Sequence, residues 1–433
     1  MFVSEQEGAT WLPNGNPFDE LLHIEPGRHY GFPPRHPKWL PEVIDEPSVF
    51  DYGPQHQSTC GLVFNEGAVT FGPAWWAGDA FLAGESRGKL YRTKLVKSRL
   101  GYVAQNQLIA GLSMLSVDVA ASPRGELVVA CHSGGPDWGT GPQGEGKVFK
   151  ITRTAPDAPQ PVLAWSASET ELRVAFDRDI DATKLKELAK HATVEQGQYV
   201  SAGDRFESFR PGYQAVKDQL AAPRYAVPVL AAALSADRRE IVLTTPPRTA
   251  TVNYAVTLPD FTGTSAPPRR AEIDIASDLT GIAADWKGAD GATWTGWLPH
   301  ADLPTARELT SASASHSKFF AGLAKPGQLK LRGQLDLWQM LQPAIQPGAK
   351  LDYERPVENV HVVFSSPWAF RLTTKQGARN SSVVDGRHVI EIPVQGRENE
   401  WLDFSADILA TGDRKSTRLN SSHERLSRMP SSA

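Results

Sequence analysis

Residues 78–95 read GDAFLAGESRGKLYRTKL, and residues 125–151 repeat that pattern as GELVVACHSGGPDWGTGPQGEGKVFKI. Each copy has a Gly-acid turn, alternating apolar residues, a Gly-rich reversal, and then Gly-Lys, two apolar or aromatic positions and a basic residue. The turns begin at Gly78 and Gly125, 47 residues apart, which is close to the repeat length of a four-stranded propeller blade. The repeat predicts two successive blades, each an antiparallel sheet that stacks on its neighbours to bury both faces. Because two blades cannot close a ring, we expect the chain to be an internal fragment of a longer protein.

The composition favours many short strands and excludes two classes of partner. The 433 residues include 36 Gly and 33 Pro, and long stretches with helical periodicity are scarce. The net charge of −4 is spread over interspersed acids and bases, so we expect no nucleic-acid partner. No apolar run approaches the roughly 20 residues of a membrane span, so we expect no transmembrane segment.

The cysteines and the two ends carry little chemistry. Cys60 and Cys131 are the two cysteines, and neither lies in a haem-attachment or zinc spacing. The pair Cys131-His132 could bind a metal, but a buried cysteine beside a loop histidine is the favoured interpretation. The N-terminal residues have no signal-peptide pattern. The Ser/Arg/Asn-rich tail 413–433 resembles a translated sequencing adapter and is expected to be disordered, the alternative being a natural basic tail.

Composition shifts divide the remaining chain into three parts. Residues 1–153 carry the blade pattern, and the Pro-rich stretch 152–161 is a linker. Residues 162–275 predict a small β-sandwich with a helix at 180–192, capped by Asp181 or Thr183, and an inserted loop at 197–227. Residues 276–410 predict a second β-sandwich-like domain, with helix at 305–324. The predicted fold class is all-β with short helices.

Several stretches of residues 1–153 together resemble a known propeller family. They are SEQEG (4–8), NPFDELLHI (16–24), GRHYGFP (27–33), GDAFLAGESRGKLYRTKL (78–95), VDVAASPRGELVVA (117–130) and GKVFKI (146–151). They resemble the closing blades of the six-bladed propeller of soluble quinoprotein glucose dehydrogenases and L-sorbosone dehydrogenase-like proteins. The resemblance implies a partial propeller of about two to three blades, followed by the two sandwich-like domains.

A longer phrase resembles a narrower group of proteins. GYVAQNQLIAGLSML (101–115) and CHSGGPDWGTGPQGEGK (131–147) are similar to large multidomain, membrane-bound dehydrogenase-like proteins of planctomycete-type bacteria. In that group sandwich modules follow the propeller, often with a C-terminal c-type haem domain. WTGWLPH (294–300) and LDLWQMLQPAIQPGAKLDY (335–353) look like those trailing modules. This chain itself has no haem motif.

The resemblance implies a pyrroloquinoline quinone (PQQ) site with one calcium ion. Gln6 matches the cofactor-contacting glutamine of the family, and Glu7 and Gly8 occupy the positions whose backbone carbonyls bind calcium. Ser86 stands where the family has its cofactor lysine, so the neighbouring Arg87 would have to supply the cation.

Two further family positions differ. Leu115, Ser116 and Val117 precede Asp118, where the family has two cofactor arginines. The histidine base of the family lies in an earlier blade, so the catalytic residue of this chain stays unknown. These differences weaken the expectation of catalysis, because cations must neutralise the carboxylates of the quinone.

Other motifs have two interpretations each. Asp137-Trp138 could form a sugar-binding loop or a turn with a core tryptophan. Trp75-Trp76 could be a ligand platform or, as we favour, a packing pair between blades. His23, His29 and His36 could bind a metal or act as a base, but hydrogen-bonding turn histidines are the favoured interpretation.

Three functional hypotheses follow. The first is a fragment of a PQQ-dependent sugar or aldehyde dehydrogenase-like oxidoreductase that passes electrons to a haem domain absent from this chain; the fragment alone would be inactive. The second is a non-catalytic propeller and sandwich protein that binds carbohydrate or protein outside the cytoplasm. The third is a structural propeller stabilised by calcium. By resemblance the protein would be periplasmic or otherwise extracytoplasmic.

Overall fold

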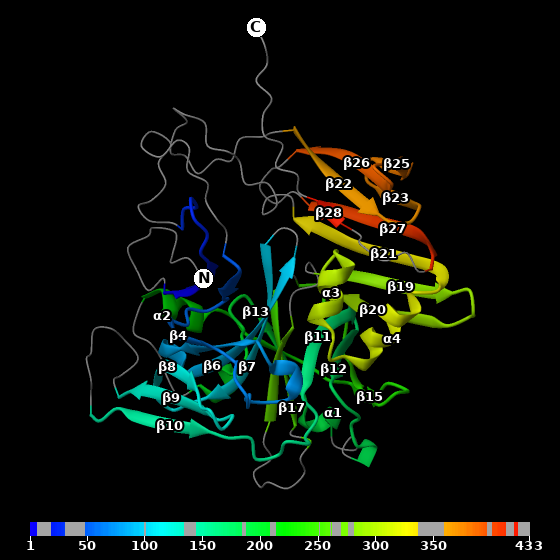
Figure 1. The fold of residues 1–433 in the computed structure, drawn as a ribbon. Coiled ribbons are helices and arrows are strands. Elements are labelled where there is room, and N and C mark those ends of the chain that lie inside the picture. Colours follow the sequence, from blue (N-terminus) through cyan, green and yellow to red (C-terminus); the bar gives the residue numbers. More distant parts are fainter. Residues whose placement is uncertain are drawn as a thin grey trace. The chain divides into compact units, whose positions relative to one another are not determined.

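The protein is all-β: a computed structural model shows mostly strands and few helices, in several antiparallel sheets (Figure 1). The structure describes residues 1–6, 19–30, 48–98, 101–133, 144–183, 188–207, 214–250, 252–259, 261, 270–275, 281–336, 359–395, 401–412 and 420–422. No helix among these residues has the length and apolar character needed to cross a membrane.

The chain divides into two compact units. Unit 1 comprises Met1–Tyr30, Asp45–Asp278 and Ala312–Ser315, and unit 2 comprises Gly31–Ile44, Leu279–Ser311 and His316–Ala433. The blade-like region and the sheets of 161–275 therefore belong to one compact unit.

Three sheets of consecutive strands open unit 1. The first has the order β1 (Phe2–Glu5), β2 (Asp19–His23), β3 (Phe50–Tyr52); the second β4 (Thr59–Phe64), β5 (Ala80–Gly84), β6 (Lys89–Ser98), β7 (Gly101–Gly111); the third β8 (Leu115–Ala121), β9 (Leu127–His132), β10 (Lys147–Ile151). In each sheet every strand pairs antiparallel with the next one in the chain. Alternating apolar residues and Gly-rich turns produce this up-and-down order.

The two sequence repeats form strand pairs with the same register. Lys89 of β6 lies opposite Gly84 of β5, and Lys147 of β10 lies opposite Cys131 of β9. Gly84 and Cys131 are each five residues beyond the acid of their Gly-acid turn. The structure thus confirms that the repeat encodes one strand pair twice.

The first strands of these sheets lie side by side. β4 contacts β1 on one side and β8 on the other, and the hydroxyl of Thr59 donates a 2.9 Å hydrogen bond to the carbonyl of Glu5. A Cβ on Gly61 would lie 2.5 Å from Cα of Asp118, so only glycine allows β4 to approach β8 this closely. A shared core, which includes Phe81, Leu90 and Val129, fills the space between the second and third sheets.

Two four-stranded sheets complete unit 1. One has the order β11 (Pro161–Ser168), β12 (Glu171–Phe176), β16 (Glu240–Thr244), β15 (Ala231–Leu234); the other β14 (Tyr225–Val227), β13 (Thr193–Gly197), β17 (Asn253–Pro259), β18 (Arg270–Ile275). One apolar core contains residues of both sheets, among them Leu172, Ile241 and Val256, each fully buried. The two sheets thus share a core, and their arrangement as a sandwich stays a prediction.

Two local predictions in this region agree with the structure only in part. The predicted helix 180–192 is described only at its ends, where Asp181 accepts the backbone N–H of Thr183 and α1 spans Leu188–His191. The prediction of a plain loop at 197–227 is wrong for part of its length. It contains the 3₁₀ turn η4 (Asp204–Phe206), helix α2 (Gln214–Ala221) and strand β14. Packing against the rest of unit 1 stabilises these short elements, which have weak local patterning.

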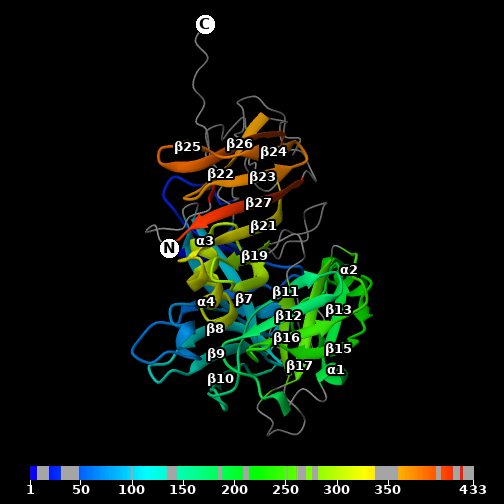
Figure 2. The same cartoon turned by 90° about the vertical axis from the view of Figure 1, so that its right-hand side faces the viewer.

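Unit 2 also has two sheets (Figure 2). The larger has the order β20 (Thr293–Leu298), β19 (Ile282–Gly288), β21 (Pro326–Asp336), β27 (Trp401–Thr411), β23 (Phe370–Thr374), β24 (Gly377–Asn380); the smaller β25 (Ser382–Val384), β26 (Arg387–Gln395), β22 (Asn359–Ser366), β28 (Asn420–Ser422). Residues of both sheets, including Leu331, Phe364 and Phe404, share one core.

The helices and the tail of unit 2 differ from the expectations in detail. The predicted helix 305–324 is two helices, α3 (Leu303–Leu309) and α4 (Ala314–Gly322). The carboxylate of Asp302 caps α3 by accepting the backbone N–H of Thr305. Within the tail that was expected to be disordered, Asn420–Ser422 instead pair with β22, because an edge strand offers unpaired backbone groups.

Candidate functional site

Two buried cations stand at the turn between β5 and β6. Arg87 ends the 3₁₀ turn η2 (Glu85–Arg87), and Lys89 begins β6. Gly88 between them has φ 62°, a left-handed conformation that few other residues adopt without strain. The turn therefore places a guanidinium and an ammonium two residues apart, at the end of a strand whose residues are buried.

The carboxylates that pair with these cations come from the segment after β13. One oxygen of Glu207, Oε2, lies 2.9 Å from Nη1 of Arg87, and the other, Oε1, lies 2.7 Å from Nζ of Lys89. Asp204 adds a second carboxylate 3.4 Å from Nζ of Lys89. The four side chains are at most 3% exposed, so the charges are neutralised inside the protein.

Hydrogen bonds hold Asp204 in place. Its carboxylate accepts the backbone N–H and the hydroxyl of Ser201, both at 2.9 Å, and the amide of Gln55 at 2.9 Å. The guanidinium of Arg224 also binds the same carboxylate. Gln55 lies before β4, so this aspartate links the blade-like sheets to the sheets of 161–275.

A further carboxyl group makes this region sensitive to pH. Burial raises the pKa of Glu272 to about 7. Burial also lowers the pKa of Lys89, and the neighbouring Glu207 opposes that change. Protons therefore bind to the surroundings of Lys89 near neutral pH.

A second buried network lies nearby. Nδ1 of His56 is 3.3 Å from Oδ2 of Asp19, and Nε2 of His56 is 2.8 Å from the hydroxyl of Ser58. The hydroxyl of Ser86 donates to that of Ser58 at 2.7 Å, and Ser58 has φ 53°.

A carboxylate, an imidazole and a hydroxyl linked in this order also form the catalytic triad of serine hydrolases. A nucleophile must touch its substrate, however, and Ser58 is fully buried. Asp19 also accepts the backbone N–H groups of Gln57 at 2.7 Å and Ser58 at 2.9 Å. We therefore assign this network to holding Ser58 in its left-handed conformation.

Of the residues expected at the quinone site, the structure describes Gln6, Ser86 and Arg87. Gln6 is half-buried after β1, whereas Glu7 and Gly8 lie outside the described residues. Arg87 is buried and ion-paired with Glu207, and Ser86 is hydrogen-bonded to Ser58.

The positions of the missing arginines are likewise occupied. Leu115 is buried, and the hydroxyl of Ser116 donates to the carbonyls of Gly84 and Lys89 at 3.1 and 3.0 Å. PQQ needs cations opposite its carboxylates, and Arg87 and Lys89 already face carboxylates of this chain. The described residues do not fit the quinone, so we derive no step through it. The assignment of Gln6, Arg87 and the calcium positions stays a prediction.

The tryptophan pair has a structural role. Trp76 is 5% exposed and belongs to the core between the second and third sheets, as the packing interpretation predicted. The guanidinium of Arg92 lies over both rings, 4.4 Å from the centre of Trp75 and 4.8 Å from that of Trp76. The indole N–H of Trp75 donates to Asp177.

The remaining candidate ligands do not form a metal site in the part of the chain that the structure describes. His23 packs its ring against Phe2 and Tyr102, and His36, Asp137 and Trp138 lie outside the described residues. Cys131 is buried, and its burial raises the pKa of the thiol to about 11. A thiol that stays protonated is a poor metal ligand.

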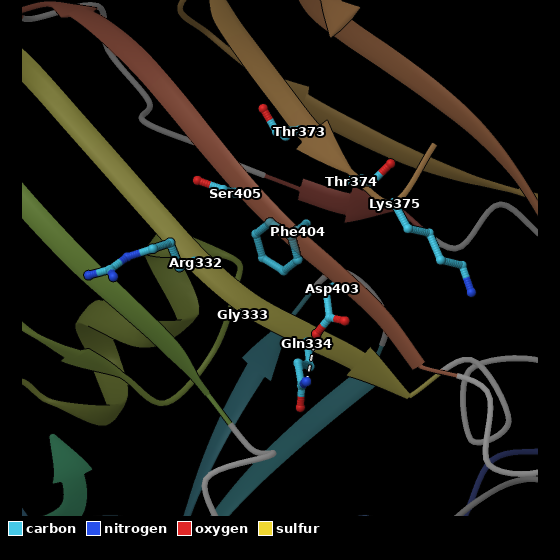
Figure 3. A pocket seen from close by; sticks show the side chains of 9 residues that line it. All are labelled: Arg332, Gly333, Gln334, Thr373, Thr374, Lys375, Asp403, Phe404 and Ser405. Carbon is cyan, nitrogen blue, oxygen red and sulfur yellow. Dashed lines mark hydrogen bonds between the residues drawn. The ribbon is translucent and has the colours of Figure 1, made fainter. Parts of the chain in front are cut away.

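Unit 2 has a hollow of about 470 Å³ on its six-stranded sheet (Figure 3). β21, β27 and β23 line it, together with the residue that follows β23; the lining residues are Arg332, Gly333, Gln334, Thr373, Thr374, Lys375, Asp403, Phe404 and Ser405. Register explains the grouping, since Ser405 lies between Arg332 and Thr373 in neighbouring strands.

The polar groups of the hollow combine donors and acceptors. Arg332 and Lys375 extend to opposite sides (Figure 3). Nε2 of Gln334 donates to Oδ1 of Asp403 at 2.6 Å, and Arg332 donates to Asp285 on β19 at 2.8 Å. The hollow is shallow and open to solvent, and its hydroxyl, amide and charged groups offer hydrogen-bond partners to a small molecule that lies against the sheet.

Comparison with known proteins adds little evidence about function. No protein-family model and no curated protein matches the sequence. Among solved structures, the chain is similar to the crystal structure of a proposed oxidoreductase (glucose dehydrogenase) from Thermus thermophilus. The two share 23% identity with a TM-score of 0.26, and the similarity covers 35% of this chain and 40% of that chain. This likeness by itself assigns no activity.

Sequence reasoning missed Lys89, Asp204 and Glu207. A signal for Lys89 was present, because both repeat copies place a lysine after the Gly-rich reversal. Asp204 and Glu207 lie in a segment of weak patterning, 115 and 120 residues from their partners Lys89 and Arg87. No local pattern indicates a pairing over that distance.

Proposed function

We propose that this chain is a non-catalytic carbohydrate-binding protein that works in the periplasm or elsewhere outside the cytoplasm. The observation that carries the proposal is the neutralisation of Arg87 and Lys89 by Glu207 and Asp204. Cations that are already paired in the protein interior cannot bind the carboxylates of a quinone without breaking those pairs. The location outside the cytoplasm follows from the family resemblance of residues 1–153.

The hollow of unit 2 supports carbohydrate as the ligand. Sugar hydroxyls both donate and accept hydrogen bonds, and the hollow offers the carboxylate of Asp403, the amide of Gln334 and the hydroxyls of Thr373 and Ser405. The hollow is shallow and open to solvent, so a saccharide would lie against the sheet and not inside a cavity.

Binding to a glycan panel, followed by calorimetry on the full chain, tests the ligand. We expect Asp403→Ala to weaken saccharide binding more than tenfold, because a hydrogen bond to a charged group contributes about 1.5–3 kcal/mol. The matched control is Asp407→Ala on the same strand and face. Asp407 lies outside the hollow and pairs with Lys330 at 3.8 Å, so this variant should bind like the wild type. Absence of saccharide binding, or equal affinities for the wild type and Asp403→Ala, would contradict the proposal.

A second candidate is the oxidoreductase: a fragment of a PQQ- and calcium-dependent sugar or aldehyde dehydrogenase that acts with a c-type haem domain. The contact of β1 with β4 favours it, since the resembling segment that begins at Ser4 then starts beside the next sheet. Dye reduction distinguishes the candidates. The intact protein of which this chain would be a fragment should reduce the dye with PQQ, calcium and an aldose under the second proposal and should not do so under the first.

A further inference from the structure

We propose that the segment Gln198–Glu207 is an occluding strap, whose Glu207 side chain fills a carboxylate-binding site formed by Arg87 and Lys89. When the strap is displaced, the same site takes a free carboxylate about the size of the glutamate side chain, such as acetate or malonate, for which the space left by Glu207 is sufficient. The inference goes beyond saccharide binding, because it assigns a second ligand class to unit 1.

The geometry at Glu207 is that of a bound carboxylate. Its two oxygens are divided between two cations, Oε2 at 2.9 Å from Arg87 and Oε1 at 2.7 Å from Lys89. The exposed fractions of the Arg87, Lys89 and Glu207 side chains are 0%, 2% and 3%. A guanidinium and an ammonium turned toward one carboxylate form the usual donor set for that anion.

The guanidinium of Arg87 and the backbone of Lys89 are held by residues outside the strap, whereas Nζ of Lys89 lies against Ser201, Asp204 and Glu207 of the strap. Nε of Arg87 donates to the carbonyl of His56 at 3.2 Å, and Gly88 fixes the turn between the two cations. The backbone of Lys89 pairs with both Gly84 of β5 and Gly111 of β7. The two cations therefore belong to the sheet formed by β4–β7, whereas Glu207 belongs to the connection between β13 and α2.

The strap is also held by the contacts of Asp204, which do not involve Glu207. Asp204 binds Ser201 within the strap, and Gln55 and Arg224 outside it. Gly203, with φ 85°, would place a Cβ 2.8 Å from Leu108, so a larger residue could not follow this path. The strap is thus shaped to bring Glu207 onto the two cations.

Chemical rescue on the full chain tests the proposal. Glu207→Ala removes the carboxylate and leaves space beside Arg87 and Lys89. We expect its melting temperature to fall on the order of 10 °C, because one half of a buried ion pair remains. Added acetate should then restore roughly half of the loss when its concentration is on the order of 100 times its Kd. Chloride at equal ionic strength should not restore the melting temperature.

Two matched variants control for general effects of acetate. Glu207→Gln lacks the charge but keeps the volume, so acetate cannot enter. Glu195→Ala removes a carboxylate from the half-exposed pair with Arg205, at 3.4 Å, and leaves no buried cation behind. Neither variant should respond to acetate beyond the chloride control.

A measurement on the wild type keeps the proposal testable if Glu207→Ala does not fold. Malonate should compete with Glu207 and increase hydrogen exchange of the amides of Ser201, Phe206 and Glu207, but not those of β5 and β6. The proposal is overturned if acetate does not rescue a folded Glu207→Ala, or if malonate leaves strap exchange at the chloride level. Either failure leaves saccharide binding at Asp403 unaffected, since that readout belongs to unit 2.

Discussion

The two repeat copies of unit 1 have the same register but opposite surroundings. In the first copy Lys89 and Leu90 are 1% and 0% exposed. In the second copy Lys147 is exposed and Val148 is 71% exposed. The ion pairs of the two copies also differ in burial. Asp79–Arg92 is buried at 3.4 Å, whereas Glu126–Lys150, at 3.1 Å, has a lysine that is 61% exposed.

The neighbours of the two strands explain the difference. β6 lies between β5 and β7, and the strap covers its first residue. β10 lies at the edge of its described sheet. The same local motif therefore forms an internal ion-pair site in one copy and a solvated strand in the other.

The largest effect is expected from removing the repeated lysine. Lys89→Met should lower the free energy of unfolding by about 3–5 kcal/mol, because the carboxylates of Glu207 and Asp204 lose a buried partner. Lys147→Met should change it by less than about 0.5 kcal/mol. Urea unfolding of both variants measures the contrast. Equal losses would mean that the environments of the two copies do not differ in energy.

A smaller contrast is expected at the next position. Leu90→Ala should cost about 2–5 kcal/mol, since Leu90 is fully buried in the core between the second and third sheets. Val148→Ala should cost less than about 0.5 kcal/mol at its exposed site. Calorimetric melting of the two variants tests this, and a similar loss in both would indicate that β10 is covered in solution.

The smallest expected effect is the pH dependence of stability, which has opposite signs at the carboxyl groups of the two copies. Burial raises the pKa of Asp79 from 3.8 to about 6, so its contribution to stability is present below pH 3.8 and is lost as the pH rises through about 6. The hydrogen bond to Lys150 lowers the pKa of Glu126 below 4.5, so its contribution is present above pH 4.5 and is lost on acidification.

Stability measured from about pH 3 to about pH 8 on Asp79→Asn and Glu126→Gln tests these signs. Asp79→Asn should remove part of the decrease between about pH 4 and about pH 7, and Glu126→Gln should remove part of the decrease on the acid side. Unchanged slopes in the matching windows would show that the two carboxyl groups do not titrate as their surroundings require.

Much of the fold could be predicted because the sequence patterns that specify it act over a few neighbouring residues. Alternating apolar residues and the Gly-acid turns at Gly78 and Gly125 specify the paired strands and their register. The sequence also pointed to Asp181 or Thr183 as a cap, and the carboxylate of Asp181 accepts the backbone N–H of Thr183. Helix α2 and strand β14 were missed, because tertiary packing rather than local pattern stabilises them.

The candidate sites were much less predictable. The resemblance singled out Arg87 as a cofactor cation, but its pairing with Glu207 depends on a residue 120 positions away. The row formed by Arg332, Ser405 and Thr373 likewise needs the pairing of β21, β27 and β23, which are far apart in the sequence. Such contacts form only when distant strands meet.

From its amino-acid sequence alone, this protein is all-β, with one strand pair encoded twice, because side-chain alternation and turn residues act within a few positions. Only the tertiary structure decided that Lys89 is an internal ion-pair partner and Lys147 a surface residue. The chemical environment of a charge depends on what covers it and which carboxylates approach it, and those groups come from distant parts of the chain.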